Sequence, residues 1–120
     1  MWTYHQSTGR LSRDGADVAT GYSGLDAGKN NPAMQEVHDV GPLPQGLYVI
    51  GHPVDTATHG PFVLPLTPDP GNTMFGRTGF LIHGDSLQHP GRASNGCIIL
   101  PRPIREQIAA SDDDELTVTA

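Results

Sequence analysis

Apolar residues along this chain occur in short runs separated by Gly, Pro, Asn and Asp. Several runs are rich in β-branched and aromatic residues, and others alternate apolar with polar side chains, which is typical of short strands bounded by turns. The runs lie at residues 2–6, 17–22, 47–51, 62–66, 79–82, 97–100 and 116–119. We therefore expect a mainly β fold of seven or eight short strands.

Four other segments depart from this pattern. Residues 103–111 begin with Pro103 and carry isoleucines four residues apart, which predicts one short helix. Residues 23–40 predict a long loop, and long loops in compact domains are often functional. Pro65 interrupts its run and indicates an edge strand, because proline cannot donate to a neighbouring strand. The acidic residues 112–114 predict a solvated turn.

Length and composition narrow the class of protein. The 120 residues fit a single domain, 1–120, and the 15 glycines and 11 prolines show no repeat, which favours a β fold over a helical bundle. No apolar stretch approaches the roughly 20 residues of a membrane-spanning helix, so we expect no membrane insertion. The net charge of −6 without a basic patch argues against nucleic acid as a partner.

The first residues and the cysteine content indicate in which cell compartment the protein is made. Residues 1–13 show no charged start followed by an apolar stretch, so we expect a protein made in the cytoplasm without a secretory signal. One cysteine cannot form an internal disulfide.

That cysteine, Cys97, is the leading candidate for chemistry. A lone cysteine is usually a small buried hydrophobe. Here Gly96 removes side-chain bulk directly before it, so nearby backbone N–H groups could face a developing oxyanion, while residues 98–100 anchor the strand behind it. A cysteine that serves only packing needs none of this, so we interpret Cys97 as a nucleophile.

A thiol nucleophile needs a base, because a free thiol is mostly protonated at neutral pH. His83 ends an apolar run 14 residues before Cys97, and the Gly- and Pro-rich loop between them can bring the two strand ends together. His89 ranks second because no apolar run anchors it. The remaining histidines are expected to be structural or solvated, namely His5, His38, His52 and His59.

Two of these motifs form a known signature. Ile82-His83-Gly84, followed by Ser94, a variable residue, Gly96, Cys97 and Ile98, resembles the catalytic signature of L,D-transpeptidases. The similarity covers most of the chain and is that of the type VI secretion L,D-transpeptidase effectors. It includes Trp2-Thr3-Tyr4, Gln6 to Gly9, Gly21 to Gly24, Gly28 to Pro32, Gly41-Pro42-Leu43-Pro44-x-Gly46-x-Tyr48 and Cys97 to Pro101.

The resemblance implies a fold and an activity. The fold is an L,D-transpeptidase-like β-sandwich with one short C-terminal helix. The activity is antibacterial, with a cysteine acyl-enzyme acting on tetrapeptide stems of peptidoglycan as an L,D-carboxypeptidase that releases D-Ala, or by exchange. Such effectors leave through the type VI secretion apparatus, act in the periplasm of target bacteria, imply a cognate immunity protein, and need no cofactor. The lack of a signal fits that route.

The resemblance also assigns catalytic roles. His83 would deprotonate Cys97, and the backbone N–H groups of Gly96 and Cys97 would bind the oxyanion. The carbonyl of Gly84 would orient His83, with Asp85 as a possible carboxylate partner or a cap for the following loop. Ser94 either hydrogen-bonds within the site or shapes the turn.

Substrate contacts are expected around this pair. Tyr22, Lys29, Asn30 and Asn31 could line the groove, or serve only loop structure. Most relatives carry histidine at the position of Asn95, which we place among the substrate-binding residues. Relatives carry a polar or basic residue near Ile99, which cannot bind a carboxylate. That task would pass to another basic residue, with three candidates: Arg77, Arg92 and Arg102.

Two other hypotheses stay open. His83, Asp85 and His89 could bind a metal ion in a cell-wall hydrolase, although their spacing matches no strong metal signature. The chain could also be a non-catalytic module that binds cell wall or docks a secretion partner, with Cys97 buried.

Overall fold

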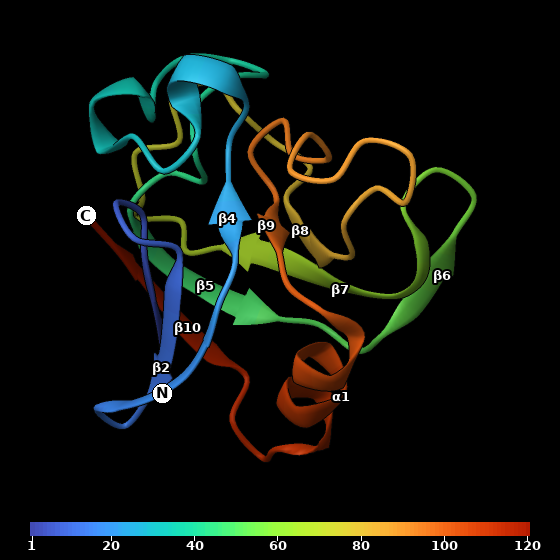
Figure 1. Cartoon of the computed structure of the whole chain (residues 1–120). Helices are drawn as coiled ribbons and strands as arrows, with labels where there is room; N and C mark the ends of the chain where they lie inside the picture. Colours follow the sequence, from blue (N-terminus) through green and yellow to red (C-terminus); the bar gives the residue numbers. More distant parts are fainter.

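The computed structural model describes all 120 residues, and it is mainly β, as the sequence predicts (Figure 1). Two 3-10 turns, Asp26–Gly28 and Pro32–Met34, lie in the expected long loop, and the helix α1 spans Arg102–Ala110. The strands are β1 (Trp2–His5), β2 (Arg10–Arg13), β3 (Ala16–Thr20), β4 (Tyr22–Ser23), β5 (Gly46–Ile50), β6 (Val54–Thr56), β7 (Gly60–Pro68), β8 (Leu81–His83), β9 (Ile98–Ile99) and β10 (Glu115–Thr119).

The strands form one continuous sheet that curves strongly. Their order is β3-β2-β1-β10-β5-β7-β8-β9-β4, with β6 paired to β7 beside this path. The two ends of the order, β3 and β4, are separated in the chain by Gly21 alone, so the sheet must curve back on itself. A Cβ at Gly21 would lie 2.0 Å from the carbonyl oxygen of Ile99, so only glycine permits this approach.

One core fills the inside of the curved sheet. Fifteen buried apolar side chains form a single cluster that takes members from both halves of the sheet and from α1. Trp2 and Leu116 come from one half, and Ile82 and Ile98 from the other, all at most 1% exposed. This shared core fixes β8, which ends at His83, and β9, which follows Cys97, relative to the rest of the fold.

The expectation of an edge strand around Pro65 is wrong. β7 lies between β5 and β8, and it runs for nine residues. The carbonyl of Pro65 accepts from Gly51 N, so the nitrogen of Pro65 faces the same neighbouring chain as its carbonyl. Pro65 is tolerated there because β5 has already ended at Ile50. The missing N–H therefore falls beyond the last paired residue of β5.

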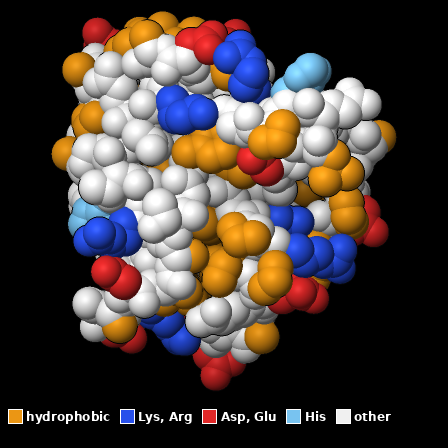
Figure 2. Space-filling view, viewed as in Figure 1, with side chains coloured by type: hydrophobic (Ala, Val, Ile, Leu, Met, Phe, Trp, Pro, Cys, Tyr) orange, Lys and Arg blue, Asp and Glu red, His pale blue; other side chains and the backbone are white.

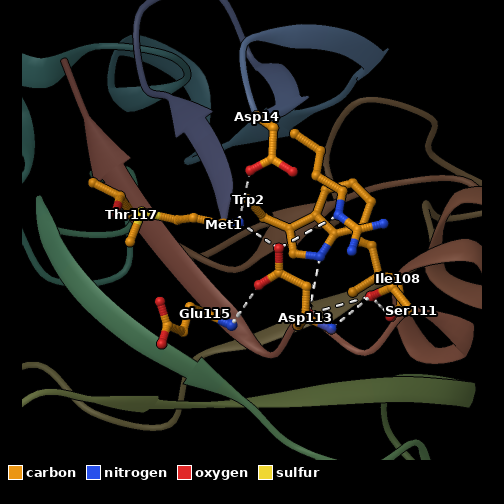
Figure 3. A network of polar contacts seen from close by, with 9 residues as sticks. Met1, Trp2, Asp14, Ile108, Ser111, Asp113, Glu115 and Thr117 are labelled. Carbon is orange, nitrogen blue, oxygen red and sulfur yellow. Dashed lines mark hydrogen bonds and ion pairs between the residues drawn. The ribbon is translucent and has the colours of Figure 1, made fainter.

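The acidic turn is not solvated throughout, which corrects the expectation for residues 112–114. The side chain of Asp113 is 14% exposed and accepts from the amino group of Met1 and from Arg13 Nε at 3.4 Å. Trp2 Nε1 donates to the Asp113 carbonyl at 3.0 Å. Figure 3 shows these contacts converging on Asp113 between α1 and β10. The turn thereby fastens the first strand to the last.

The other elements predicted from the sequence are confirmed in part. The helix and the strands at 2–5, 46–50, 81–83 and 115–119 are confirmed within one or two residues, whereas β2, β4 and β6 were not predicted as separate strands. None of the helices has the length and apolarity that crossing a bilayer takes. Charged side chains of both signs are interspersed on the face shown in Figure 2, with no basic patch there.

Candidate active site

His83 and Cys97 come to the same face of the sheet because two short strands run parallel. β8 ends at His83 and β9 begins directly after Cys97, with Ile82 paired to Ile98 and His83 to Ile99. Continuing that register sets Cys97 opposite Leu81. Since side chains alternate along a strand, His83 and Cys97 point to the same face, diagonal to each other.

The ring of His83 is held in one orientation. Its Nδ1 lies 2.9 Å from the carbonyl oxygen of Gly84, the contact expected from the resemblance, and a carbonyl can only accept. Nδ1 therefore carries the proton, and Nε2 is the lone-pair nitrogen. Burial lowers the pKa of His83 below its ordinary value, so the ring is neutral at neutral pH and can act as a base.

Cys97 is a neutral thiol in the resting protein. It is half-buried, and this burial raises the pKa of the thiol, although the Leu81 backbone N–H and the Arg77 guanidinium act in the opposite direction. No hydrogen bond joins its sulfur to His83 in this structure. The pair is thus a neutral acid beside a neutral base, and it is not an ion pair.

The segment 94–97, called the nucleophile turn below, is shaped by the buried hydroxyl of Ser94. Ser94 Oγ donates to the Cys97 carbonyl at 2.6 Å and accepts from the N–H groups of Gly24 and Gly96 at 2.8 and 3.0 Å. The structure thus gives Ser94 a turn-shaping place. Ser23 Oγ binds the Gly96 carbonyl at 2.7 Å, which ties the turn to β4.

The hydrogen bond from Gly96 corrects one expected role. Its N–H already donates to Ser94, so it is not free to stabilise an oxyanion. The N–H of Cys97 makes no hydrogen bond within the chain, so it remains available as a donor. Gly96 is instead required for its backbone, with φ of +134° and space for a Cβ blocked by Arg77 Nη2 at 2.5 Å.

Arg77 braces the nucleophile turn from behind. Its buried guanidinium donates to the Asn95 carbonyl at 3.2 Å, and also to the carbonyls of Gln35, Gly41 and Pro42 at 2.6 to 2.9 Å. Because the guanidinium N–H groups already donate to these carbonyls, Arg77 has no free pair of N–H donors for a substrate carboxylate. Of the three arginines considered, it is the structural one.

A polar cavity of about 430 Å³ opens in front of His83. Its walls are the turn between β6 and β7, the end of β8, and the segment 86–93, called the rim loop below, which Figure 1 shows beside the hairpin of β6 and β7. Arg92 lies in this wall and pairs with Asp26 at 2.6 Å, both side chains being largely exposed. Of the three arginines considered as carboxylate anchors, only Arg92 lines this cavity.

Asp85 organises the rim loop. Its carboxylate accepts from the Tyr22 hydroxyl at 2.5 Å and from the N–H groups of Ser86 and Gly91, while His83 bonds to Gly84 instead. The same hydroxyl accepts from Ala93 N at 3.0 Å. These contacts lower the pKa of Asp85, whereas burial and Asp85 raise that of Tyr22 to about 12. Of the two roles expected for Asp85, the structure shows the loop cap.

Three other expected substrate contacts do not line this cavity. Lys29 Nζ lies 4.5 Å from the centre of the Tyr22 ring, and Tyr22 does not line the cavity either. Asn31 accepts from Ala33 N and donates to the Ala27 carbonyl, and it thereby caps a 3-10 turn. Asn95 lines a separate hollow of about 190 Å³ beside Arg77.

Asn30 and Arg102 likewise have other neighbours. Asn30 Oδ1 accepts from Ser23 N at 3.2 Å within the same loop. Arg102 lies over the ring of Phe62 on the far side of the hairpin.

Two residues of the site were not predicted from the sequence. His59, in the turn between β6 and β7, has its ring centre 4.7 Å from that of His83. Arg105, buried on α1, donates to the carbonyls of Phe62 and Leu100 at 2.9 and 2.6 Å. The sequence contained a sign that Arg105 is buried, because this cation lies three residues from Ile108 on the apolar face of the helix. The sequence contained no such sign for His59, because its contact with His83 arises only when the hairpin packs against β8.

The metal-binding alternative lacks its donor set. No three His, Cys, Asp or Glu side chains of the chain converge on one point. Asp85 is engaged by the rim loop, and His89 is exposed, with its backbone N–H bonded to Ser86 Oγ. The residues that would have to act together are thus held apart by the loop that carries two of them.

Comparison with known families gives one match. The family model described as the Tlde1 domain, that of the type VI secretion L,D-transpeptidase effectors, matches residues 17–118 and so covers both candidate catalytic residues. No curated protein matches the chain.

Proposed function

Because the chain belongs to the Tlde1 domain family, whose members are type VI effectors with L,D-transpeptidase-like activity on peptidoglycan, we propose a specific reaction for it. Cys97 attacks the bond between the L-centre of diaminopimelate and D-Ala in a tetrapeptide stem. The enzyme is then an L,D-carboxypeptidase when water resolves the acyl-enzyme, and an exchange enzyme when an amine does. The observation that carries this proposal is the parallel pairing of β8 and β9, which sets His83 and Cys97 on one face.

The first half of the reaction forms a thioester. His83 Nε2 accepts the thiol proton as the sulfur of Cys97 bonds to the carbonyl carbon, and the Cys97 N–H donates to the developing oxyanion. When the C–N bond breaks, the same proton passes from His83 to the nitrogen of D-Ala, which leaves as a neutral amine. The neutral resting pair suits this route, because the proton moves only as the bond forms.

The second half releases the product. A water molecule attacks the thioester carbonyl while His83 takes one of its protons, and the Cys97 thiolate leaves and regains that proton. A free D-amino acid or the amine of another stem can replace water, which gives exchange or cross-linking. Arg92 supports the substrate carboxylate from the cavity wall, since it is the one arginine there.

A direct assay tests the reaction. Purified protein incubated with a tetrapeptide muropeptide should release D-Ala, detected by mass spectrometry, and Cys97→Ala should abolish release. His83→Gln should lower it strongly, because a neutral amide is no base, while His52→Ala, an exposed histidine remote from the cavity, should match wild type. Release by Cys97→Ala would refute the proposal. Release blocked by a chelator but untouched by iodoacetamide would instead favour the metal hypothesis.

We extend the proposal to the whole chain as one catalytic domain. β1 and β2 lie outside the matched segment, yet β1 sits between β2 and β10 in the sheet, and Trp2 is part of the core. Deleting residues 1–15 should therefore unfold the protein. A deletion variant that keeps both its fold and its D-Ala release would show that the catalytic domain is smaller.

The biological setting is proposed from the family. The enzyme acts in the periplasm of a target bacterium, and a cognate immunity protein of the producer covers the cavity beside His83. Co-expression with the neighbouring gene product should block D-Ala release in the assay above. An inhibitor that binds elsewhere, leaving the cavity open to substrate, would refute this placement.

A further inference from the structure

The hairpin of β6 and β7 brings a second histidine against the candidate base. The ring centres of His59 and His83 are 4.7 Å apart, and the ring planes are tilted by 52°. The backbone N–H of His59 donates to Thr56 Oγ1 at 2.8 Å, and its Nδ1 lies 3.0 Å from Thr58 Oγ1. His59 also lines the cavity in front of His83.

The hairpin is braced in this position. Arg105 from α1 binds the Phe62 carbonyl and also the Leu100 carbonyl at the end of β9. Asp55 accepts from Phe62 N at 3.0 Å across the hairpin. Phe62 itself has a φ of +55°, an uncommon backbone for a bulky side chain, which a structure keeps only where its surroundings hold it. The approach of His59 to His83 is therefore built into the fold.

The charged and titratable groups around His83 come from five parts of the fold. His59 faces it from the hairpin, Arg105 from α1 and Asp85 from the segment after β8. Arg92 lines the same cavity from the rim loop, and Cys97 lies diagonally, directly before β9. Around neutral pH the two arginines stay cationic and Asp85 stays anionic. An imidazole changes charge as the pH falls, and two protonated rings at this distance repel each other.

We propose that His59 is a positioning residue that covers one face of His83 and disfavours its protonation, which keeps the base neutral as the pH falls. The value of this for catalysis rests on the proposed function, in which His83 must accept a proton. The electrostatic coupling between the rings of His59 and His83 does not depend on the proposed function. Burial is the first cause of the lowered pKa of His83, and the His59 ring contributes both to that burial and by its charge.

An NMR titration of the His83 ring tests the coupling without any substrate. In His59→Ala the His83 ring gains solvent and loses its charged neighbour, so it should titrate at a higher pH than in wild type. His59→Gln keeps most of the volume and removes only the charge, so its shift should be smaller and in the same direction. His52→Ala should leave His83 unchanged.

The catalytic consequence has a separate readout. The acid limb of kcat/KM should move to higher pH in His59→Ala, with rates close to wild type above that limb. A merely structural role would lower the rate equally at every pH. The inference is overturned if His83 titrates as in wild type in both folded variants. If His59→Ala does not fold, His59→Gln decides alone. An inactive wild type would refute the proposed function, while the titration would still decide the coupling.

Discussion

The nucleophile turn and the rim loop follow each other in the chain, but they are held in opposite ways. In the nucleophile turn, Ser94 and Gly96 are buried, and hydrogen bonds with Ser23 and Gly24 tie the turn to a neighbouring segment. In the rim loop, Leu87 is 99% exposed, and Arg92 meets an equally exposed Asp26. The sulfur of Cys97 thus lies on a turn that several buried hydrogen bonds hold in place, whereas the rim loop is largely exposed.

This difference separates two tasks. Reacting atoms must be held within about half an ångström of their productive positions, and that requires supporting groups that are themselves immobile. A wall that receives a flexible peptide stem gains from side chains that can adjust. We therefore expect substitutions in the nucleophile turn to cost stability and activity together, and substitutions in the rim loop to change mainly substrate affinity.

The largest effect is expected from Gly96→Ala. The new Cβ would lie 2.5 Å from Arg77 Nη2 and 2.7 Å from the Phe80 ring, at a φ of +134°. Backbone strain alone should cost about 3 kcal/mol, and D-Ala release should fall at least tenfold. Urea unfolding and the muropeptide assay measure the two effects.

Gly15→Ala is the matched control. Gly15 also has a positive φ, +85°, but nothing lies within 4 Å of its Cβ position. This substitution should cost about 1 kcal/mol and leave activity intact. Equal losses of stability in the two variants would contradict the argument from crowding.

Arg77→Met should rank second. It leaves four backbone carbonyls without their donor, among them that of Asn95 in the nucleophile turn, and we expect unfolding to become easier by about 3 kcal/mol. Arg102→Met, which removes an exposed arginine that stacks on Phe62, should cost less than about 1 kcal/mol. Chemical denaturation compares them. Similar losses would mean that Arg77 does not brace the turn.

Thiol labelling probes the frame around the nucleophile without substrate. Burial raises the pKa of Cys97 in the folded state, so at pH 8 iodoacetamide should label the native protein several-fold more slowly than the unfolded chain. The labelling rate should keep rising at pH values where that of the unfolded chain has levelled off. Relative to the unfolded chain, the neutral buried thiol contributes its full stability below the pKa of the unfolded thiol, and this contribution is lost as the pH rises from there through the higher pKa of the folded state. A native profile that coincides with the unfolded one would contradict this assignment.

The smallest effects are expected in the rim loop and at Asp85, which caps it. Asp85→Asn weakens the contacts to Tyr22 and Gly91, so the substrate KM should rise a few-fold while the free energy of unfolding falls by about 1 kcal/mol. Leu87→Ser, in the same loop and without contacts to lose, should change stability by less than about 0.5 kcal/mol. A large loss of kcat in Asp85→Asn would show that the carboxylate acts on His83 directly.

Local patterns predicted those parts of the site that depend on local structure. The strand ending at His83 and the strand following Cys97 are visible as apolar runs that stop at chemically active residues. The central position of β7 was not predictable, because Pro65 is unfavourable in a central strand unless its neighbour happens to end opposite it. Where β5 ends relative to Pro65 depends on the pairing of two strands, and the apolar pattern of one strand does not reveal it.

Tertiary contacts account for the rest. The approach of His59 to His83 depends on a hairpin whose position is set by Arg105 on α1, more than 40 residues further along the chain. Asp113 likewise has partners at the opposite end of the sequence. A run of three aspartates looks solvated until β1 and β10 are known to pair, so its role follows only from the assembled sheet.

The position of β10 bears on when this sheet can exist during synthesis. β10 separates β1 from β5 and leaves the ribosome after the other nine strands of this sheet. The three N-terminal strands therefore wait, without their central neighbour, until residues 115–119 emerge. Contacts so distant in sequence make folding slow, on the order of milliseconds to seconds. A ribosome-bound chain that lacks these residues has no complete sheet, and the fold is completed after its last strand is made.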